Sequence, residues 1–238
     1  MTSQPFVDAL MAAHASAAPL PATPGLALPQ SREEANAVQD AVVGALGGAG
    51  AWKVSPWVDG EEPAAAPIPA RWVHRSGAIL PADPRYRLEV EFALVLTRDP
   101  AGAIDPADVE VALAFELLRP RLADPQEWPP LARHADLQSS GGLVLGPSRP
   151  LPAQDVADRA LTLELSGQSP ATVSTRLDPA LLLKTLAWLA AHARFRNQAL
   201  VPGLPILTGA RIGPLPLPAG TAAATSDGFE PVRMQLAK

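Results

Sequence analysis

The stretch RLEVEFALVL, residues 87–96, decides the fold that we predict for this chain. Successive side chains of a β-strand point to opposite faces, so Glu89 and Glu91 lie side by side on one face. The flanking apolar residues indicate a buried strand, where two unpaired carboxylates repel each other and are costly. A bound cation would resolve this conflict; a solvent-exposed strand face with Arg87 as counter-charge is the alternative. The other face carries Leu88, Val90, Phe92, Leu94 and Leu96.

A second stretch, VEVALAFELL at residues 109–118, has the same alternation and supplies a third carboxylate. Glu116 falls on the face opposite the large hydrophobic side chains, where small alanines leave room above it. Three carboxylates favour a hard divalent cation such as Mg²⁺ or Mn²⁺, which prefers oxygen ligands and can keep positions open for substrate. The spacing along the chain does not fix how Glu116 meets the first pair.

The composition narrows the classes of partner. The chain has 238 residues, a formal net charge of -5 and no run of basic residues, which gives nucleic acid or an anionic membrane no electrostatic basis for binding. The absence of cysteine excludes disulfides, zinc–thiolate sites and cysteine nucleophiles. The N-terminal segment lacks a basic start and is interrupted by Asp8 and His14, so we expect an amphipathic helix rather than a secretory signal. No apolar run is long enough for a membrane span, and we expect a cytoplasmic protein.

The order of elements predicts a single α+β domain over residues 1–238, with a helical part at 1–50 and a β-rich catalytic part at 51–238. Ser31 and Glu34 form a capping-box pattern that begins a helix, and Asp178 with Pro179 begins another. A proline- and alanine-rich loop is expected through residue 70, after the short strand AWKVSPW. Most other segments alternate as strands do, which favours a curled antiparallel sheet with few helices.

Seven segments in this order resemble one known family: AVQDAVV, AWKVS, LEVEFALVL, LAFELLRPR, ADLQSSGGLVLG, LAWLA and LPILTGARIG. They are similar to the fumarylacetoacetate hydrolase superfamily, most closely its branch of 2-keto-4-pentenoate hydratases and 4-oxalocrotonate decarboxylases. The resemblance implies a mixed or antiparallel β-sheet roll and a homo-oligomer. It also implies that Glu89, Glu91 and Glu116 hold Mg²⁺ or Mn²⁺, which chelates the 1-carboxylate and 2-oxo oxygens of a small 2-oxo acid.

The resemblance also implies a role for Lys53. It matches a family lysine, and its neighbours Trp52, Val54 and Trp57 would remove it partly from water. Desolvation lowers a lysine pKa and would suit Lys53 to proton transfer or to orienting an anionic substrate. The alternative is a lysine whose stem covers apolar surface while its head reaches water.

Further candidate substrate-binding residues follow from the same resemblance. The Ser-Ser-Gly-Gly turn could offer hydroxyl and backbone donors to a carboxylate, although such turns are also ordinary loops. The threonine of the Leu-Thr-Gly turn contacts substrate or simply closes the turn, and the arginine after the third glutamate pairs with a ligand carboxylate or with the substrate acid. These residues are Ser139, Ser140, Asp136, Thr208 and Arg121. His74, in the loop before the Glu-x-Glu strand, is a further acid or base candidate.

The sequence departs from the family pattern in the run ELLRPR, where Arg119 and Pro120 stand in place of Asp and Ser. We expect a metal-dependent hydratase acting on a small 2-oxo or 2-hydroxydienoic acid. A decarboxylase of the same family, and a non-catalytic member or partner subunit of an active homologue, are the alternatives; the altered run favours the non-catalytic one. A carbon–carbon bond hydrolase is disfavoured because no His-Glu pair for water activation is evident, and a serine hydrolase because no Gly-x-Ser-x-Gly elbow is present.

Overall fold

The computed structural model describes residues 4–16, 18–100, 104–154 and 156–237. Its α-helices are α1 (Gln4–Ala15), α2 (Arg32–Ala45), α3 (Pro130–Ala135) and α4 (Pro179–Phe195). Short 3₁₀ turns cover Ala70–Trp72, Pro106–Asp108, Pro125–Glu127 and Leu137–Ser139. The strands are β1 (Ala49–Val54), β2 (Ala65–Pro69), β3 (Val73–Arg75), β4 (Ala78–Pro81), β5 (Arg87–Leu96), β6 (Val109–Leu118), β7 (Ser140–Pro150), β8 (Val156–Leu165), β9 (Ala171–Leu177), β10 (Pro205–Pro216), β11 (Gly220–Ser226) and β12 (Val232–Ala237).

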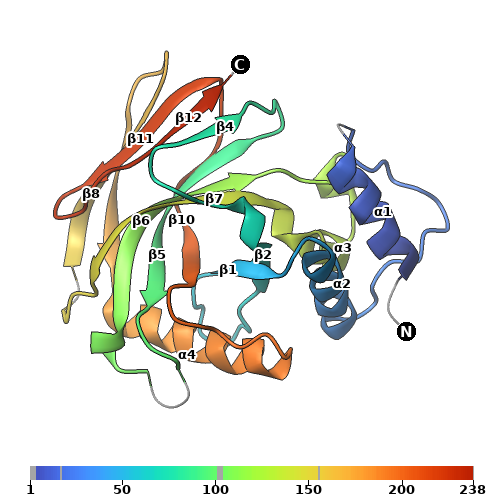
Figure 1. Cartoon of the computed structure of the whole chain (residues 1–238), viewed down its shortest axis with the longest axis horizontal. Helices are drawn as coiled ribbons and strands as arrows, with labels where there is room; N and C mark the ends of the chain where they lie inside the picture. Colours follow the sequence, from blue (N-terminus) through green and yellow to red (C-terminus); the bar gives the residue numbers. More distant parts are fainter. Residues whose placement is uncertain (1–3, 17, 101–103, 155, 238) are drawn as a thin grey trace.

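The strands form two sheets of mixed direction (Figure 1). The larger sheet has the order β2-β1-β10-β5-β6-β7-β3, and the smaller has the order β4-β12-β11-β8-β9. Most neighbours are antiparallel, while β1 with β10, β3 with β7 and β4 with β12 are parallel. The predicted α+β class with a curled, mostly antiparallel sheet is therefore confirmed.

The main hydrophobic core lies where the two sheets and α4 meet. Phe92 of β5 and Phe115 of β6 face Leu163 of β8 and Met234 of β12 across it, and Leu186 packs from α4. The alternation expected for β5 and β6 is confirmed, because the large side chains of both strands belong to this core. Burial of this apolar surface is the dominant stabilising contribution to the fold.

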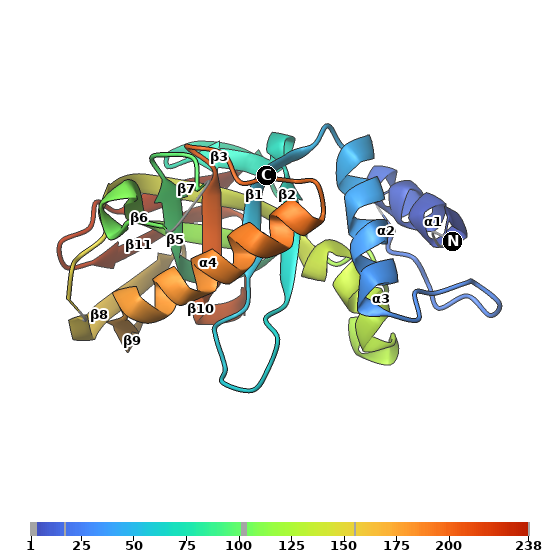
Figure 2. The same cartoon turned by 90° about the horizontal axis from the view of Figure 1, so that it is seen from below.

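A separate core joins α1, α2 and α3 at one end of the molecule, beside the larger sheet (Figure 2). It contains Phe6 of α1, Val38 of α2 and Ala132 of α3. The capping prediction for α2 is confirmed, since the Ser31 hydroxyl accepts a hydrogen bond from the Glu34 backbone N–H at 3.2 Å. Asp178 likewise accepts from the backbone N–H of Leu181 at the start of α4.

One local prediction was wrong. The proline- and alanine-rich segment expected to be a loop through residue 70 contains β2, which pairs antiparallel with β1. Pro67 and Pro69 lie in this strand, which forms the edge of the sheet, where the missing backbone N–H breaks no ladder.

Within the described residues, no helix is long and apolar enough to cross a membrane.

Candidate metal centre and active site

The pairing of β5 with β6 brings the three glutamates together. Glu89 lies directly opposite Glu116, and Glu91 lies opposite Ala114, whose small side chain leaves space. One carboxylate oxygen from each of Glu89, Glu91 and Glu116 lies within 4.8 Å of the others. Glu91 is 2% exposed and Glu116 is fully buried. The register of one hairpin therefore supplies the link that spacing along the sequence did not.

The donor set fits a hard divalent cation. All three side chains offer carboxylate oxygens, the ligands that Mg²⁺ and Mn²⁺ prefer. The Oε2 atom of Glu116 is buried and has no hydrogen-bond partner among the described residues. An unpaired buried carboxylate oxygen is costly, and a cation would satisfy it. The role of these glutamates as ligands stays a prediction.

Burial and repulsion between carboxylates make Glu89 and Glu91 weaker acids in the absence of metal. Burial raises the pKa of Glu91 to about 8, with Glu116 and Glu89 adding to the rise and Lys53 opposing it. Burial also raises the pKa of Glu89 to about 7, and the Glu116 carboxylate adds to that rise. A cation must therefore displace protons from this cluster near neutral pH.

Lys53 reaches the same cluster from β1. Its position is opposite Leu207 of β10, which in turn lies opposite Ala93 of β5, so Lys53 shares the face of the glutamates. The Lys53 Nζ donates to Glu116 Oε1 at 2.7 Å and to the Gln138 carbonyl at 3.3 Å. The side chain of Lys53 is 14% exposed.

The expected fall in the Lys53 pKa was wrong for this arrangement. Burial does lower the pKa of the Lys53 ammonium, but Glu116, and after it Glu91 and Glu89, raise the pKa by more. The pKa therefore lies above its ordinary value. In the metal-free protein Lys53 is a firmly held cation that compensates part of the carboxylate charge.

The Leu-Thr-Gly turn of β10 positions Glu91. The backbone N–H of Gly209 donates to Glu91 Oε2 at 2.7 Å. Gly209 has φ +98°, and a Cβ at this position would lie 2.6 Å from the Pro56 side chain, so only glycine fits. Thr208 is 3% exposed, and its hydroxyl donates to the Phe92 carbonyl at 2.7 Å. This hydrogen bond ties β10 to β5, and the contact of Thr208 with substrate stays a prediction.

The Ser-Ser-Gly-Gly segment approaches the cluster through a strained turn. Leu137, Gln138 and Ser139 have consecutive φ values of 50°, 50° and 63°, a left-handed conformation that is uncommon outside glycine. The Ser140 hydroxyl and the side-chain nitrogen of Gln138 are both buried, and neither has a hydrogen-bond partner in the part of the chain that the structure describes. Gln138 and Ser139 also line a hollow of about 270 Å³ together with Arg133 and His134. Gln138 thus takes part both in this hollow and in the contact with Lys53, whereas none of the three glutamates lines the hollow.

Gln138 was missed by sequence reasoning. Its backbone carbonyl holds Lys53, and its side-chain amide is an unsatisfied buried donor at the same turn. The only signal in the sequence was its place between two positions matched to the family, Asp136 and Ser139.

Arg121 and Asp136 do not reach the candidate substrate site. Arg121 is fully buried, and its Nε donates to Asp136 Oδ1 at 2.6 Å. The remaining Arg121 donors go to backbone carbonyls, including that of Arg119 at 2.7 Å. Each nitrogen of the guanidinium therefore has a partner inside the protein, and the prediction of substrate binding is corrected for both residues. Their ion pair instead anchors the segment between β6 and β7.

His74 is also placed away from the glutamates. It lies in β3, which pairs with β7 at the far edge of the larger sheet. It lines a cavity with Arg119 and Trp72 rather than covering the carboxylates. Its candidacy as an acid or base for this site is therefore not supported.

No protein-family model matches the sequence, and no curated protein is significantly similar to it. Solved structures are similar in fold. A 4-oxalocrotonate decarboxylase from Pseudomonas putida G7, complexed with magnesium and adipate, has a TM-score of 0.76 at 16% identity, covering 100% of this chain and 99% of the other. A fumarylpyruvate hydrolase from Pseudomonas aeruginosa, in complex with Mn²⁺ and pyruvate, has a TM-score of 0.53 at 16% identity, covering 79% and 88%.

A 5-carboxymethyl-2-hydroxymuconate delta-isomerase from Mycobacterium smegmatis has a TM-score of 0.53 at 21% identity, covering 79% of each chain. These matches confirm the fold expected from the resemblance to the fumarylacetoacetate hydrolase superfamily, and the match over the whole chain is to a decarboxylase of the expected branch. At these identities they establish the fold and leave the reaction open.

Proposed function

We propose that this protein is a Mg²⁺- or Mn²⁺-dependent lyase of the hydratase type, acting on a small 2-oxo or 2-hydroxydienoic acid. One observation carries the proposal: the buried Glu91 and Glu116 and the half-buried Glu89 bring carboxylate oxygens within 4.8 Å of one another, and one oxygen of Glu116 lacks any partner in the described chain. The neighbours in fold include enzymes solved with magnesium or Mn²⁺ and with small carboxylic acids, which supports the same substrate class.

When bound, the cation would supply Lewis-acid polarisation of a 2-oxo group. The residues of the chain prepare for this in three ways. Gly209 fixes one Glu91 oxygen, and the β5–β6 register fixes the spacing of the glutamates. Lys53 holds a proton at Nζ beside Glu116, where it can orient an anionic substrate or deliver that proton. Gln138 and Ser140 offer unsatisfied buried groups on the turn that adjoins Lys53.

A decarboxylase reaction is the second candidate, and a specific observation favours it. The decarboxylase structure matches the chain over its whole length, whereas the isomerase and hydrolase match 79% of it. The two reactions use the same polarised 2-oxo group and differ in whether water adds or a carboxylate departs. The product formed therefore distinguishes them.

The decisive experiment follows the ultraviolet absorbance of 2-hydroxypenta-2,4-dienoate with Mg²⁺, with Mn²⁺ or with chelator. We expect metal-dependent loss of the dienol signal that disappears in Glu91→Gln, with incorporation of water in the product by mass spectrometry. Release of CO₂ from 4-oxalocrotonate, without hydration of the dienol, would favour the decarboxylase.

Metal-induced thermal stabilisation without turnover of either acid would favour the non-catalytic alternative.

In the structure, Arg119 of the altered run pairs with Asp83 on the face of the sheet opposite the glutamates. The departure from the family pattern therefore leaves the carboxylate cluster intact. The homo-oligomer stays a prediction, and light scattering after size exclusion would check it.

A further inference from the structure

A second cavity lies across the larger sheet from the glutamates. Its volume is about 430 Å³, and its wall includes Leu117 of β6 and Arg119, which directly follows that strand. Glu116 and Leu117 are successive residues of one strand, so their side chains point to opposite faces. Leu117 belongs to the core between the sheets, whereas Ala114 on the face of Glu116 belongs to a different cluster. The two sites share a strand and no lining residue.

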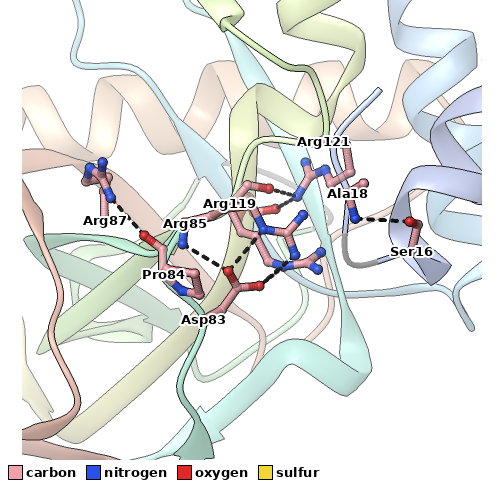
Figure 3. Close-up of polar contacts among 9 residues, drawn as sticks. Ser16, Ala18, Asp83, Pro84, Arg85, Arg87, Arg119 and Arg121 are labelled. Atoms are coloured by element: carbon pink, nitrogen blue, oxygen red, sulfur yellow. Dashed lines mark hydrogen bonds and ion pairs between the residues drawn. The ribbon is translucent and has the colours of Figure 1, made fainter. Parts of the chain in front are cut away.

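The cavity carries an excess of positive charge. Asp83 is the only acid among its lining residues. This carboxylate accepts from Arg85 and from Arg119, each at 2.7 Å, and these hydrogen bonds hold its pKa well below the ordinary range (Figure 3). Arg71 also lines the cavity and makes no ion pair with any carboxylate in the described ranges. Asp83 is thus shared between two arginines and its charge is already compensated, whereas Arg71 has no carboxylate partner in those ranges.

His14 provides a second, independent observation. Both of its ring nitrogens are buried and have no hydrogen-bond partner among residues whose positions are described. Either neutral tautomer carries one N–H, so a buried donor is left without an acceptor. The ring lies 5.3 Å from that of Trp72, at the cavity wall. Burial, and after it the charges of the nearby Arg121, Arg119 and Arg71, together lower the pKa of His14 to about 3. A bound anion would satisfy the donor and offset the arginines.

We propose that this cavity binds a small organic acid whose carboxylate accepts hydrogen bonds from Arg71, Arg119 and His14. The apolar part of the ligand packs against Trp72 and Leu80, which line the same space. The volume falls in the range of small-molecule sites, and guanidinium groups recognise carboxylates through charge-assisted hydrogen bonds. The site is independent of the metal centre and goes beyond the function proposed for it.

Calorimetric titration of the full chain with succinate, in the presence of chelator, tests this proposal. We expect Arg71→Gln and Arg119→Gln each to raise the Kd at least about tenfold, because each removes a charge-assisted contact. Arg87→Gln is the matched control: Arg87 is exposed and donates only to the backbone carbonyls of Pro84 and Tyr86, so its loss should leave the Kd unchanged. Glu91→Gln should also leave it unchanged.

A histidine NMR signal gives a second readout. Succinate should shift the ring resonance of His14 and leave that of His192, which stacks on Trp188 outside the cavity, in place. Arg71 is exposed, so its substitution keeps the fold even if Arg119→Gln does not.

Three results would overturn the proposal. The first is weaker succinate binding in Glu91→Gln but not in Arg71→Gln, which would assign the acid to the metal centre. The second is binding of inorganic phosphate, with the same arginine dependence, in place of succinate. The third is the absence of binding up to about 10 mM.

Discussion

The two faces of the larger sheet near the end of β6 carry opposite charge and are assembled in different ways. On one face, Glu89, Glu91 and Glu116 come from two adjacent strands whose register is set by a single hairpin. On the other, the cavity of about 430 Å³ collects Arg119 from just after β6, His14 from α1 and Asp83 from the segment between β4 and β5. A site made by neighbouring strands follows from their alternation, whereas a site made by distant segments depends on how helices and sheets pack.

We expect the largest effect from a substitution on the face of the sheet that carries the three glutamates. Glu91→Gln removes a carboxylate that Gly209 orients toward the cluster, and we expect kcat/KM to fall about 10³-fold, or about 4 kcal/mol of transition-state stabilisation. The matched control is Glu110→Gln. Glu110 lies in β6 on the same face as Glu116, but near the opposite end of the strand. Its carboxylate accepts a hydrogen bond from the hydroxyl of Ser148 in β7. Equal losses in both variants would show that charge on this face matters generally and that no specific centre exists.

The buried ion pair between Arg121 and Asp136 and the partly exposed pair between Arg119 and Asp83 should differ in their contribution to folding. Asp136→Asn leaves the fully buried Arg121 without its counter-charge, and we expect the free energy of unfolding to fall by about 3 kcal/mol. Asp83→Asn should cost about 1 kcal/mol or less, because Asp83, Arg85 and Arg119 remain 16–20% exposed. Urea unfolding would measure both. A cost for Asp83→Asn as large as that for Asp136→Asn would mean that the cavity is closed to water rather than open to a ligand.

The sequence predicted well what depends on alternation and local capping. The burial of β5 and β6, the caps at Ser31 and Asp178, and the common face of Glu89 and Glu91 all follow from spacing within one element. β2 was missed because its prolines read as a loop; only an edge position in a sheet, which is a tertiary property, lets them remain in a strand.

The candidate site was predictable in its residue types and less so in its roles. The pKa of Lys53 was misjudged because local desolvation was visible in the sequence, whereas the number of carboxylates facing the ammonium was not. Arg121 and Asp136 were assigned to substrate because nothing in their spacing of fifteen residues announces a buried pair with each other. In both cases the residues that these side chains contact in the folded protein set their roles, and the spacing in the sequence did not reveal those contacts.

The metal-free carboxylate face should make stability fall as pH rises. Glu89 and Glu91 have an ordinary carboxyl pKa of 4.5 in the unfolded chain and values of about 7 and about 8 when folded. The folded protein thus holds more protons between pH 4.5 and about 8, and its stability relative to the unfolded chain is lost across that window. We expect a loss of about 2 kcal/mol between about pH 6.5 and 8 in chelator.

Saturating Mg²⁺ or Mn²⁺ should remove most of this pH dependence, since the cation binds the ionised carboxylates. Thermal unfolding at several pH values, with chelator and with metal, would measure it. The Glu91→Gln variant serves as the control, with a shallower slope in chelator and little response to metal. A slope that metal leaves unchanged would place the titrating groups elsewhere in the chain.

The smallest expected effect on folding concerns Ser140. It tests whether the turn that carries Ser139 and Ser140 binds substrate beside the three glutamates. The Ser140 hydroxyl is buried without a partner, so Ser140→Ala removes an unsatisfied group and should change the free energy of unfolding by no more than about 0.5 kcal/mol. If the hydroxyl donates to a bound acid, KM should rise about fivefold with little change in kcat, because contact to an unreacting carboxylate is lost equally from substrate and transition state. Ser139→Ala is the comparison, since Ser139 lines the adjoining hollow and its backbone already holds Arg119. Steady-state kinetics and urea unfolding of the two variants would separate the roles. A marked loss of stability without a change in KM would show that Ser140 holds the left-handed turn and leaves substrate recognition to Gln138 and Lys53.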